Sequence, residues 1–252
     1  MDGSLTLRLE DVSKSFARVE EDGIVHALSR IDLEMHDSEF VCIVGASGCG
    51  KSTILRLACG LIAPTTGIVT VNGARVEKPG PEIGMVFQKP TLFPWLTVEE
   101  NIAFSLKIGE KDPAWIEKTE RMLSLIGLEQ FRNDYPAQLS GGMAQRVALV
   151  RSLVSDPTIL LLDEPMSALD AFTRMKLQDE VLAIWQQRKP LFVMVTHDVD
   201  EAIYMATRVL VMDSNPGRVK DDIAIDLPYP RMRSSQEFTS YRNRILGILG
   251  ID

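Results

Sequence analysis

The 252-residue sequence is poor in cysteine and short of positive charge. Its three cysteines, Cys42, Cys49 and Cys59, cannot form a complete set of disulfides and lack C-x-x-C spacing, which predicts reduced, buried thiols. Lysine and arginine number 27 against 35 acidic residues, giving a net charge of −8. Because a duplex-binding protein usually carries a basic surface, nucleic acid is not an expected partner.

Long apolar runs are also missing from the sequence. Segments such as 159–162 and 191–195 are far shorter than the roughly 20 apolar residues that a membrane-spanning helix needs. A membrane role would therefore be peripheral. The remaining composition, 45% hydrophobic and 25% charged, is typical of a globular chain and excludes a disordered or low-complexity one.

The hydrophobic pattern predicts one α/β domain over residues 1–252. Strands are expected at 5–12, 40–44 and 68–72, and strands and helices alternate again from residue 158, which indicates a mostly parallel sheet with an antiparallel portion near the N-terminus. Residues 97–155 are mainly helical in pattern and predict an inserted helical subdomain. A tail helix is expected over about 234–250, opened by a capping box of Ser234 and Glu237.

A phosphate-binding loop is predicted between the strand at 40–44 and a helix that begins near Ser52. Residues 45–52 read GASGCGKS and fit the pattern G-x-x-x-x-G-K-[ST], in which backbone N–H groups and a helix N-terminus receive phosphates. Lys51 would reach the β- and γ-phosphates, and the Ser52 hydroxyl would bind Mg²⁺. The predicted nucleotide contacts here are Gly45, Ala46, Ser47, Gly48, Cys49, Gly50, Lys51, Ser52 and Thr53.

Two acidic residues end the apolar run at 159–162. In open α/β sheets ligands bind at the carboxyl ends of parallel strands, so Asp163 is placed to hold Mg²⁺ and Glu164 to act as the general base on the attacking water. An exposed acidic strand end is the alternative when the run is taken alone. Together the two motifs predict a P-loop NTPase and leave a kinase or a GTPase open.

A third motif narrows that choice. Residues 139–146 read LSGGMAQR, in which Ser140 is a good helix N-cap and two glycines leave backbone N–H groups accessible. This segment resembles the signature sequence of the ATP-binding cassette (ABC) ATPases, and the resemblance extends over residues 5–227. It implies an active ATPase that binds ATP and Mg²⁺.

The resemblance also implies roles for single residues. Gln88 matches the Q-loop glutamine that contacts Mg²⁺ and water, and His197 matches the switch histidine that contacts the γ-phosphate. Phe16 stands where the family places an aromatic ring on adenine, although tyrosine is more usual there and a core phenylalanine is the alternative. The other implied nucleotide contacts are Ser140, Gly141, Gly142 and Gln145 of the signature and Asp170 of the D-loop (SALD, 167–170).

The partners implied by the resemblance are a second ATPase subunit, with a homodimer expected, and an integral membrane permease. ATP would lie between the phosphate loop of one subunit and the LSGG segment of the other. Residues 88–98, including the FPWLTV segment and Trp95, are expected to face the permease, although local packing of Trp95 is an alternative. A solute-binding protein would take part indirectly, and the location would be the cytoplasmic face of the cell membrane.

Within the family, residues 93–98 and 217–233 and the tail helix resemble the nitrate, sulfonate and taurine importers. Importers of riboflavin, thiamine precursors or aromatic acids share much of this pattern and remain alternatives. A soluble ABC ATPase that acts outside transport is less expected, because such relatives usually carry coiled coils or tandem cassettes.

Overall fold

The computed structural model describes residues 5–17, 23–108, 113–214 and 216–251. Within them the larger sheet has six strands in the order β10-β9-β3-β8-β7-β6, and only the β10–β9 pair is antiparallel. The strands are β3 (Phe40–Gly45), β6 (Ile83–Val86), β7 (Ile159–Asp163), β8 (Leu191–Val195), β9 (Arg208–Asp213) and β10 (Arg218–Ala224).

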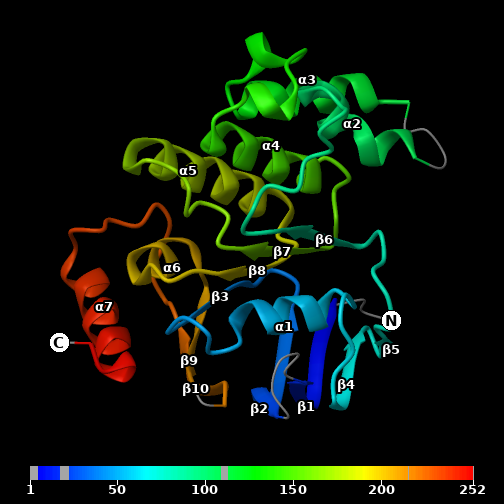
Figure 1. Ribbon diagram of the computed structural model, residues 1–252. Helices are drawn as coiled ribbons and strands as arrows, with labels where there is room; N and C mark the ends of the chain where they lie inside the picture. Colours follow the sequence, from blue (N-terminus) through cyan, green and yellow to red (C-terminus); the bar gives the residue numbers. More distant parts are fainter. Residues whose placement is uncertain (1–4, 18–22, 109–112, 215, 252) are drawn as a thin grey trace.

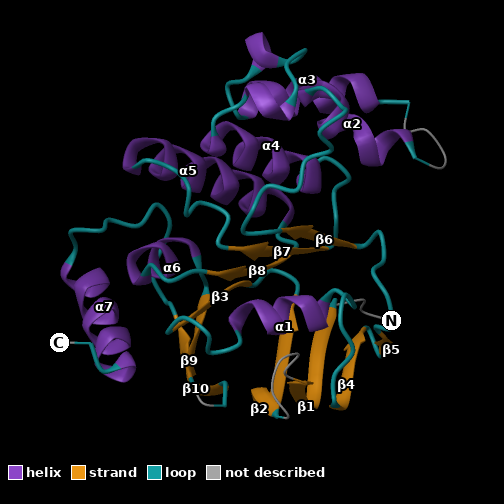
Figure 2. Ribbon diagram, in the orientation of Figure 1, coloured by secondary structure: helices purple, strands orange, loops and turns teal. Residues whose placement is uncertain are grey.

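A smaller antiparallel sheet lies beside the first, as Figure 2 shows in orange. Its order is β2-β1-β4-β5, and its strands are β1 (Thr6–Ala17), β2 (Ile24–His36), β4 (Thr66–Val71) and β5 (Ala74–Arg75). The predicted α/β class, with a mostly parallel sheet and an antiparallel portion near the N-terminus, is confirmed.

Helix α1 (Lys51–Ala58) lies between the two sheets, whereas α5 (Ala171–Arg188) and α6 (Val199–Met205) cover the opposite face of the parallel sheet (Figure 1). Successive side chains of β3 point to opposite faces of the sheet, so this strand contributes to the hydrophobic core on each face. Phe40 and Cys42 pack on the α5 and α6 side, and Val41 and Ile43 pack on the α1 side. Because this central strand is buried on both faces, the loop that follows it starts from a fixed position.

Three helices stand between β6 and β7 and form the upper part of Figure 1. They are α2 (Val98–Lys107), α3 (Trp115–Leu125) and α4 (Gly141–Leu153), with 3₁₀ turns at Glu129–Phe131 and Pro136–Gln138. All three helices lie within residues 97–155. Across the described residues, every helix is too short or too polar to cross a bilayer.

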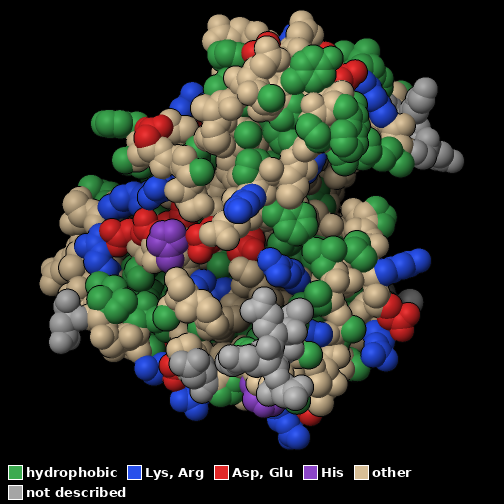
Figure 3. Space-filling view, in the orientation of Figure 1, with side chains coloured by type: hydrophobic (Ala, Val, Ile, Leu, Met, Phe, Trp, Pro, Cys, Tyr) green, Lys and Arg blue, Asp and Glu red, His purple; other side chains and the backbone are tan. Residues whose placement is uncertain are grey.

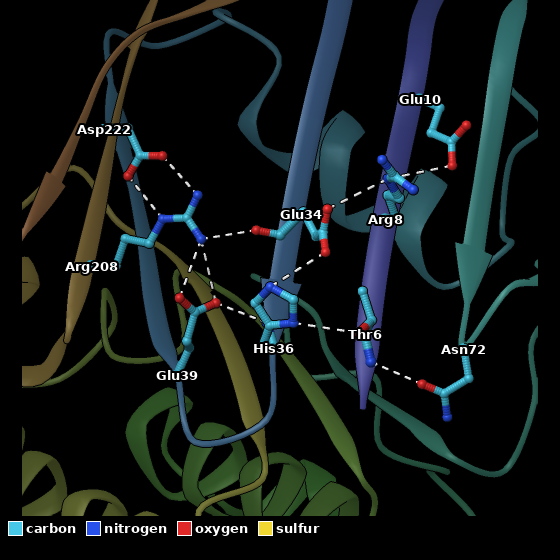
Figure 4. Close-up of polar contacts among 9 residues, drawn as sticks. All are labelled: Thr6, Arg8, Glu10, Glu34, His36, Glu39, Asn72, Arg208 and Asp222. Atoms are coloured by element: carbon cyan, nitrogen blue, oxygen red, sulfur yellow. Dashed lines mark hydrogen bonds and ion pairs between the residues drawn. The ribbon is translucent and has the colours of Figure 1, made fainter. Parts of the chain in front are cut away.

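Charged side chains join the two sheets at the end of β3 that lies away from the phosphate loop (Figure 4). The Arg208 guanidinium of β9 donates to the backbone oxygen of Glu34 on β2 at 2.8 Å and forms two hydrogen bonds with Asp222 at 2.8 and 2.7 Å. It also contacts Glu39 at 3.2 Å. One arginine therefore links β2, the start of β3, β9 and β10 far from the candidate site.

The last helix, α7 (Gln236–Leu249), corrects the predicted cap. Ser235, and not Ser234, is the N-cap, because its side chain accepts the backbone N–H of Phe238 at 3.1 Å. Glu237 therefore lies in the first turn of the helix, one residue too early for the expected capping box. Phe238 and Ile245 bury one face of α7 against the main core.

Candidate active site

The phosphate loop connects β3 to α1 and depends on glycine. Gly48 and Gly50 have φ of 80° and 93°, in the left-handed region that favours glycine. A Cβ on Gly50 would lie 2.4 Å from Leu28 Cδ2, so this residue has no room for a side chain. No side chain caps α1, and its first N–H groups are free of such a partner and point toward the loop.

Lys51 begins α1 and is only 7% exposed. Its ammonium donates to the backbone oxygens of Gly45 at 2.7 Å and Ala46 at 3.0 Å, so the side chain folds back over the loop. Cys49 is fully buried, and its side chain packs under the loop and does not line it. Among the predicted contacts, Ala46, Ser47 and Gly48 are exposed, which makes them the accessible part of the loop.

Asp163, at the end of β7, meets the first turn of α1. The Ser52 hydroxyl donates to Asp163 Oδ1 at 2.8 Å, which joins two residues that lie 111 positions apart in the sequence. Burial raises the pKa of Asp163, although the hydrogen bond from Ser52 opposes that rise. Two of the three predicted magnesium ligands, Ser52 and Asp163, therefore form one pair of oxygen atoms, with the Asp163 side chain almost entirely buried.

Glu164 brings together three segments of the chain. Its Oε2 accepts a hydrogen bond from Gln88 Nε2 at 3.1 Å and lies 3.3 Å from His197 Nδ1. The backbone of Glu164 has a φ of 46°, unusual for a residue other than glycine, and its N–H donates to Val195 O at 3.0 Å. The sheet thus holds this carboxylate in a strained position between the glutamine that follows β6 and the histidine that follows β8.

The signature segment starts α4 in the helical insertion. Ser140 caps the helix by accepting the Met143 N–H at 3.3 Å, as its position in the sequence predicts. Ser140 and Gly141 are exposed, and a Cβ on Gly141 would meet no atom within 4 Å. Gly142 is closer to the body of the protein, since a Cβ there would lie 3.0 Å from Leu169 Cδ2 of the D-loop.

Gln145 is a correction to the predicted set of nucleotide contacts. It is 1% exposed, and its amide donates to Phe87 O at 3.2 Å, beside Gln88. A side chain buried against the backbone cannot touch a nucleotide from this position. Gln145 instead ties the first turns of α4 to the segment after β6.

Two other predicted contacts have visible structural roles. Asp170 is the N-cap of α5 and accepts the backbone N–H groups of Phe172 and Thr173, both at 3.1 Å. The Thr173 side-chain hydrogen bond lowers the pKa of Asp170. Phe16 lies on β1 with 39% of its surface exposed and with the Lys14 ammonium 5.0 Å from its ring centre. A contact of either residue with nucleotide stays a prediction.

The segment after the Q-loop is held around Asn101, which sequence reasoning missed. Asn101 is fully buried, accepts the Phe93 N–H at 2.9 Å and donates to the carbonyls of Phe93, Leu96 and Thr97. Trp95 lies in this turn with 69% of its surface exposed, and its ring centre is 5.7 Å from that of Phe93. A contact of Trp95 with the permease stays a prediction. The sequence offered one signal for this role, because Asn101 is a polar residue among the buried positions of α2.

On the face shown in Figure 3, acidic, basic and histidine side chains gather near the middle of the molecule, below α4 and α5 of Figure 1. The described residues hold no group of three or more His, Cys, Asp and Glu side chains with the geometry of a metal site. A cation here would take its further ligands from a hydroxyl, an amide or a phosphate, as Ser52 and Gln88 allow.

The family comparison shows to which family the chain belongs. Residues 28–167 match the model described as ABC transporter, and that span contains the phosphate loop, Gln88, the signature and the Asp163–Glu164 pair. The chain belongs to the ABC transporter family. It is an ATPase coupled to transport, as the ATP-binding proteins of this family are.

Individual relatives agree over nearly the whole chain. An uncharacterized ABC transporter ATP-binding protein, MJ0412 of Methanocaldococcus jannaschii, is 48% identical over 96% of this chain and 91% of its own length. The aliphatic sulfonates import ATP-binding protein SsuB of Bacillus cereus is 43% identical over 96% of this chain and 95% of its own. The dimeric ATP-binding cassette MJ0796, solved with ADP and Pi, superposes with a TM-score of 0.79 at 32% identity and covers 88% of this chain and 100% of its own.

Proposed function

We propose that this chain is the ATP-hydrolysing subunit of an importer for a small anion of the sulfonate, taurine or nitrate kind. It works as a pair of cassettes under a membrane permease, at the cytoplasmic face of the cell membrane. The observation that carries the hydrolytic role is the meeting of Glu164, Gln88 and His197 beside the Ser52–Asp163 pair.

Glu164 is the general base of this proposal. It accepts a proton from the water that attacks the γ-phosphorus of ATP, and the bond from that phosphorus to the bridging oxygen breaks, leaving ADP and inorganic phosphate. Gln88 and His197 both contact Glu164 Oε2, so they are placed to orient the water and the γ-phosphate. Lys51 and the N–H groups at the start of α1 hold the phosphates, and Phe16 offers a half-exposed ring to the base.

The Asp163–Ser52 pair fits Mg²⁺. Burial raises the pKa of Asp163, which means that the fold leaves its negative charge poorly compensated, and a divalent cation supplies that compensation. A carboxylate and a hydroxyl are the oxygen ligands that Mg²⁺ prefers alongside phosphate oxygens and water. When bound, the ion would neutralise charge that develops on the phosphates.

The signature segment supports the pairing of two cassettes. Ser140 and Gly141 present an exposed helix start in the helical insertion, while Lys51 belongs to the parallel-sheet core. In a head-to-tail pair, the start of α4 in one copy would receive the γ-phosphate bound by the other copy. Asp170 and the D-loop, packed against Gly142, would lie across the same boundary.

Trp95 is the anchor for the permease in this proposal. Large exposed aromatic side chains are frequent centres of protein interfaces, and the four hydrogen bonds of Asn101 hold the turn that presents this one. The anion cargo is supported by the SsuB relatives, whose names state import of aliphatic sulfonates. No contact of this chain with the cargo is part of the proposal.

The permease part of the proposal is tested by copurification from membranes. Trp95→Ala is compared with Ile116→Ala, which truncates another exposed apolar residue, 57% exposed, in the helical insertion. We expect the permease to be lost from the first variant and kept by the second, with ATPase activity retained by both. Equal retention of the permease would overturn the anchor.

The cargo is tested by uptake in cells that carry or lack this chain. Uptake of an aliphatic sulfonate, taurine or nitrate should depend on the chain and on an intact Glu164. Chain-dependent uptake of riboflavin or an aromatic acid, with none of the three anions, would overturn the proposed cargo class and leave the ATPase role intact.

A further inference from the structure

The C-terminal tail (residues 227–249) contacts α6, the helix that follows the switch histidine His197. His197 lies in a three-residue turn, Thr196–Asp198, between the end of β8 and the start of α6. Its side chain is 64% exposed and is fixed from outside the turn only by the contact with Glu164 in the described residues. The position of His197 therefore depends on how firmly its two neighbours and α6 are held.

Arg231 fixes the C-terminal end of α6. It is 6% exposed, and its guanidinium lies 4.2 Å from the ring centre of Tyr229. It donates to five backbone oxygens that surround it, those of Ile203, Tyr204, Ala206, Ile225 and Leu227. The last turn of α6 thereby gains partners for carbonyls that a helix end leaves unpaired.

Glu201 fixes the switch turn from within the protein. It is 4% exposed, and its carboxylate receives the Thr196 hydroxyl at 2.5 Å and the Gln178 amide at 3.0 Å. Its backbone N–H donates to Asp198 Oδ1 at 3.0 Å, so both neighbours of His197 are tied to Glu201. Arg233 of the tail donates to Gln178 Oε1 at 2.5 Å and completes the chain of contacts from the tail to the turn.

Arg242 of α7 fixes the N-terminal end of α6. It forms a two-pronged ion pair with Asp200, in which Nη2 lies 2.6 Å from Oδ2 and Nε contacts Oδ1. Asp200 is in the first turn of α6, two residues after Asp198. Arg242, Leu246 and Leu249 also line a hollow of about 700 Å³ whose other walls include residues 45–47 of the phosphate loop and His197.

From these contacts we propose that the tail positions His197 for hydrolysis, with Arg242 as the positioning residue that acts through Asp200. Figure 1 shows α7 beside α6, at the edge of the sheet. The inference rests on the proposed hydrolytic role of His197 and extends it to a segment outside the family's matched residues 28–167. A change in the tail would then alter the rate of ATP hydrolysis without altering the binding of ATP.

The test compares Arg242→Ala with Arg244→Ala in the purified full chain. Arg244 is the matched control, because it lies on the same helix and pairs with Asp221 of β10 at 3.3 Å, away from α6. We expect Arg242→Ala to lower kcat by about tenfold, since small displacements of an active group cost that much, with less than twofold change in KM. Arg244→Ala should keep both values, and Arg242→Lys should recover part of the loss.

A double mutant tests whether Arg242 acts through Asp200. If Arg242 acts through Asp200, adding Asp200→Asn to Arg242→Ala should cause no further fall in kcat. Additive losses, or equal losses in Arg242→Ala and Arg244→Ala, would overturn the inference. So would a fall in ATP affinity together with kcat. Absence of ATPase activity in the unmodified chain together with its permease would instead overturn the proposed function itself.

Discussion

The phosphate-loop half and the signature half of this site differ in how much of their chemistry lies within one chain. In the first, Lys51, Asp163 and Glu164 all have partners a few ångströms away, supplied by the end of β3, the first turn of α1 and the segment after β6. In the second, Ser140 caps its own helix and Gly141 faces open space. One half is assembled by the sheet, and the other is an exposed helix start.

This difference explains why the same chain needs a second copy in the proposed function. A parallel sheet brings its strand ends to one edge whether or not a partner is present, so the acids and the loop meet by topology alone. The start of α4, by contrast, presents Ser140 and Gly141 at the surface of its own chain. The substitutions below therefore divide into those that act within one copy and those that act between copies.

The largest effect is expected within one copy, at Glu164. Glu164→Gln keeps the shape of the side chain and removes the base, so hydrolysis should fall by about 10²–10⁴-fold while ATP still binds. Steady-state phosphate release and nucleotide binding measure the two properties. Glu180→Gln on α5, whose carboxylate lies 3.8 Å from the Lys176 ammonium, is the control and should retain full turnover. A Glu164→Gln variant with near-normal turnover would remove the residue from its role.

Lys51→Ala should act on binding within the same copy. Loss of charged hydrogen bonds to phosphate should weaken ATP affinity by roughly 10–100-fold, since each such bond contributes about 1.5–3 kcal/mol. Titration calorimetry on the Glu164→Gln background avoids turnover during the measurement. Lys176→Ala, which truncates an exposed lysine on α5, serves as the control. Unchanged affinity in Lys51→Ala would contradict the loop assignment.

Gly141→Asp should act only between copies. Because a Cβ at Gly141 meets no atom within 4 Å, the fold should accept the change, but a carboxylate there would repel the phosphate bound by the partner. ATP affinity of the single chain should stay within about twofold, while ATP-dependent pairing, measured by light scattering, is lost. Gly247→Asp on α7, where space is equally open, should pair normally. Normal pairing of Gly141→Asp would show that the signature does not face a nucleotide.

The smallest effect is expected on stability, at Asp163. Burial raises its pKa above the unfolded value, so the free energy of unfolding falls as the pH rises from about 4 to that raised pKa. The full cost is present above the raised pKa and is absent below about pH 4. Without Mg²⁺, Asp163→Asn should therefore raise Tm at pH 7 and should leave it unchanged at low pH. A lower Tm at pH 7 would show that the carboxylate stabilises the fold by itself.

Local sequence patterns predicted most of the fold and the phosphate-loop half of the site. The glycine pattern and its flanking periodicity placed the loop before α1 to within one residue, because such a turn needs left-handed backbone at Gly48 and Gly50. The Ser140 cap followed from residue type in the same way. These features depend on a few neighbouring residues, which is why a sequence shows them.

Features that depend on distant contacts were missed or misplaced. Gln145 was expected to contact the nucleotide but is buried against Phe87. The packing of α4 on the segment after β6 determines the direction of this side chain. Asn101 and Glu201 organise turns from buried positions, and only tertiary contacts reveal it. The cap of α7 moved from Ser234 to Ser235, since two adjacent serines offer the same signal one residue apart.

The most direct test mixes two variants that are each defective in a different half. In the Glu164→Gln background, a Lys51→Ala chain and a Gly141→Asp chain are labelled with a donor and an acceptor dye, and energy transfer is measured as ATP and Mg²⁺ are added. Neither variant should pair with itself. The mixture should pair, because it rebuilds one complete site from the intact loop of one chain and the intact signature of the other. A mixture that remains unpaired, while the parent Glu164→Gln chains pair with ATP, would contradict the claim that two copies share each nucleotide.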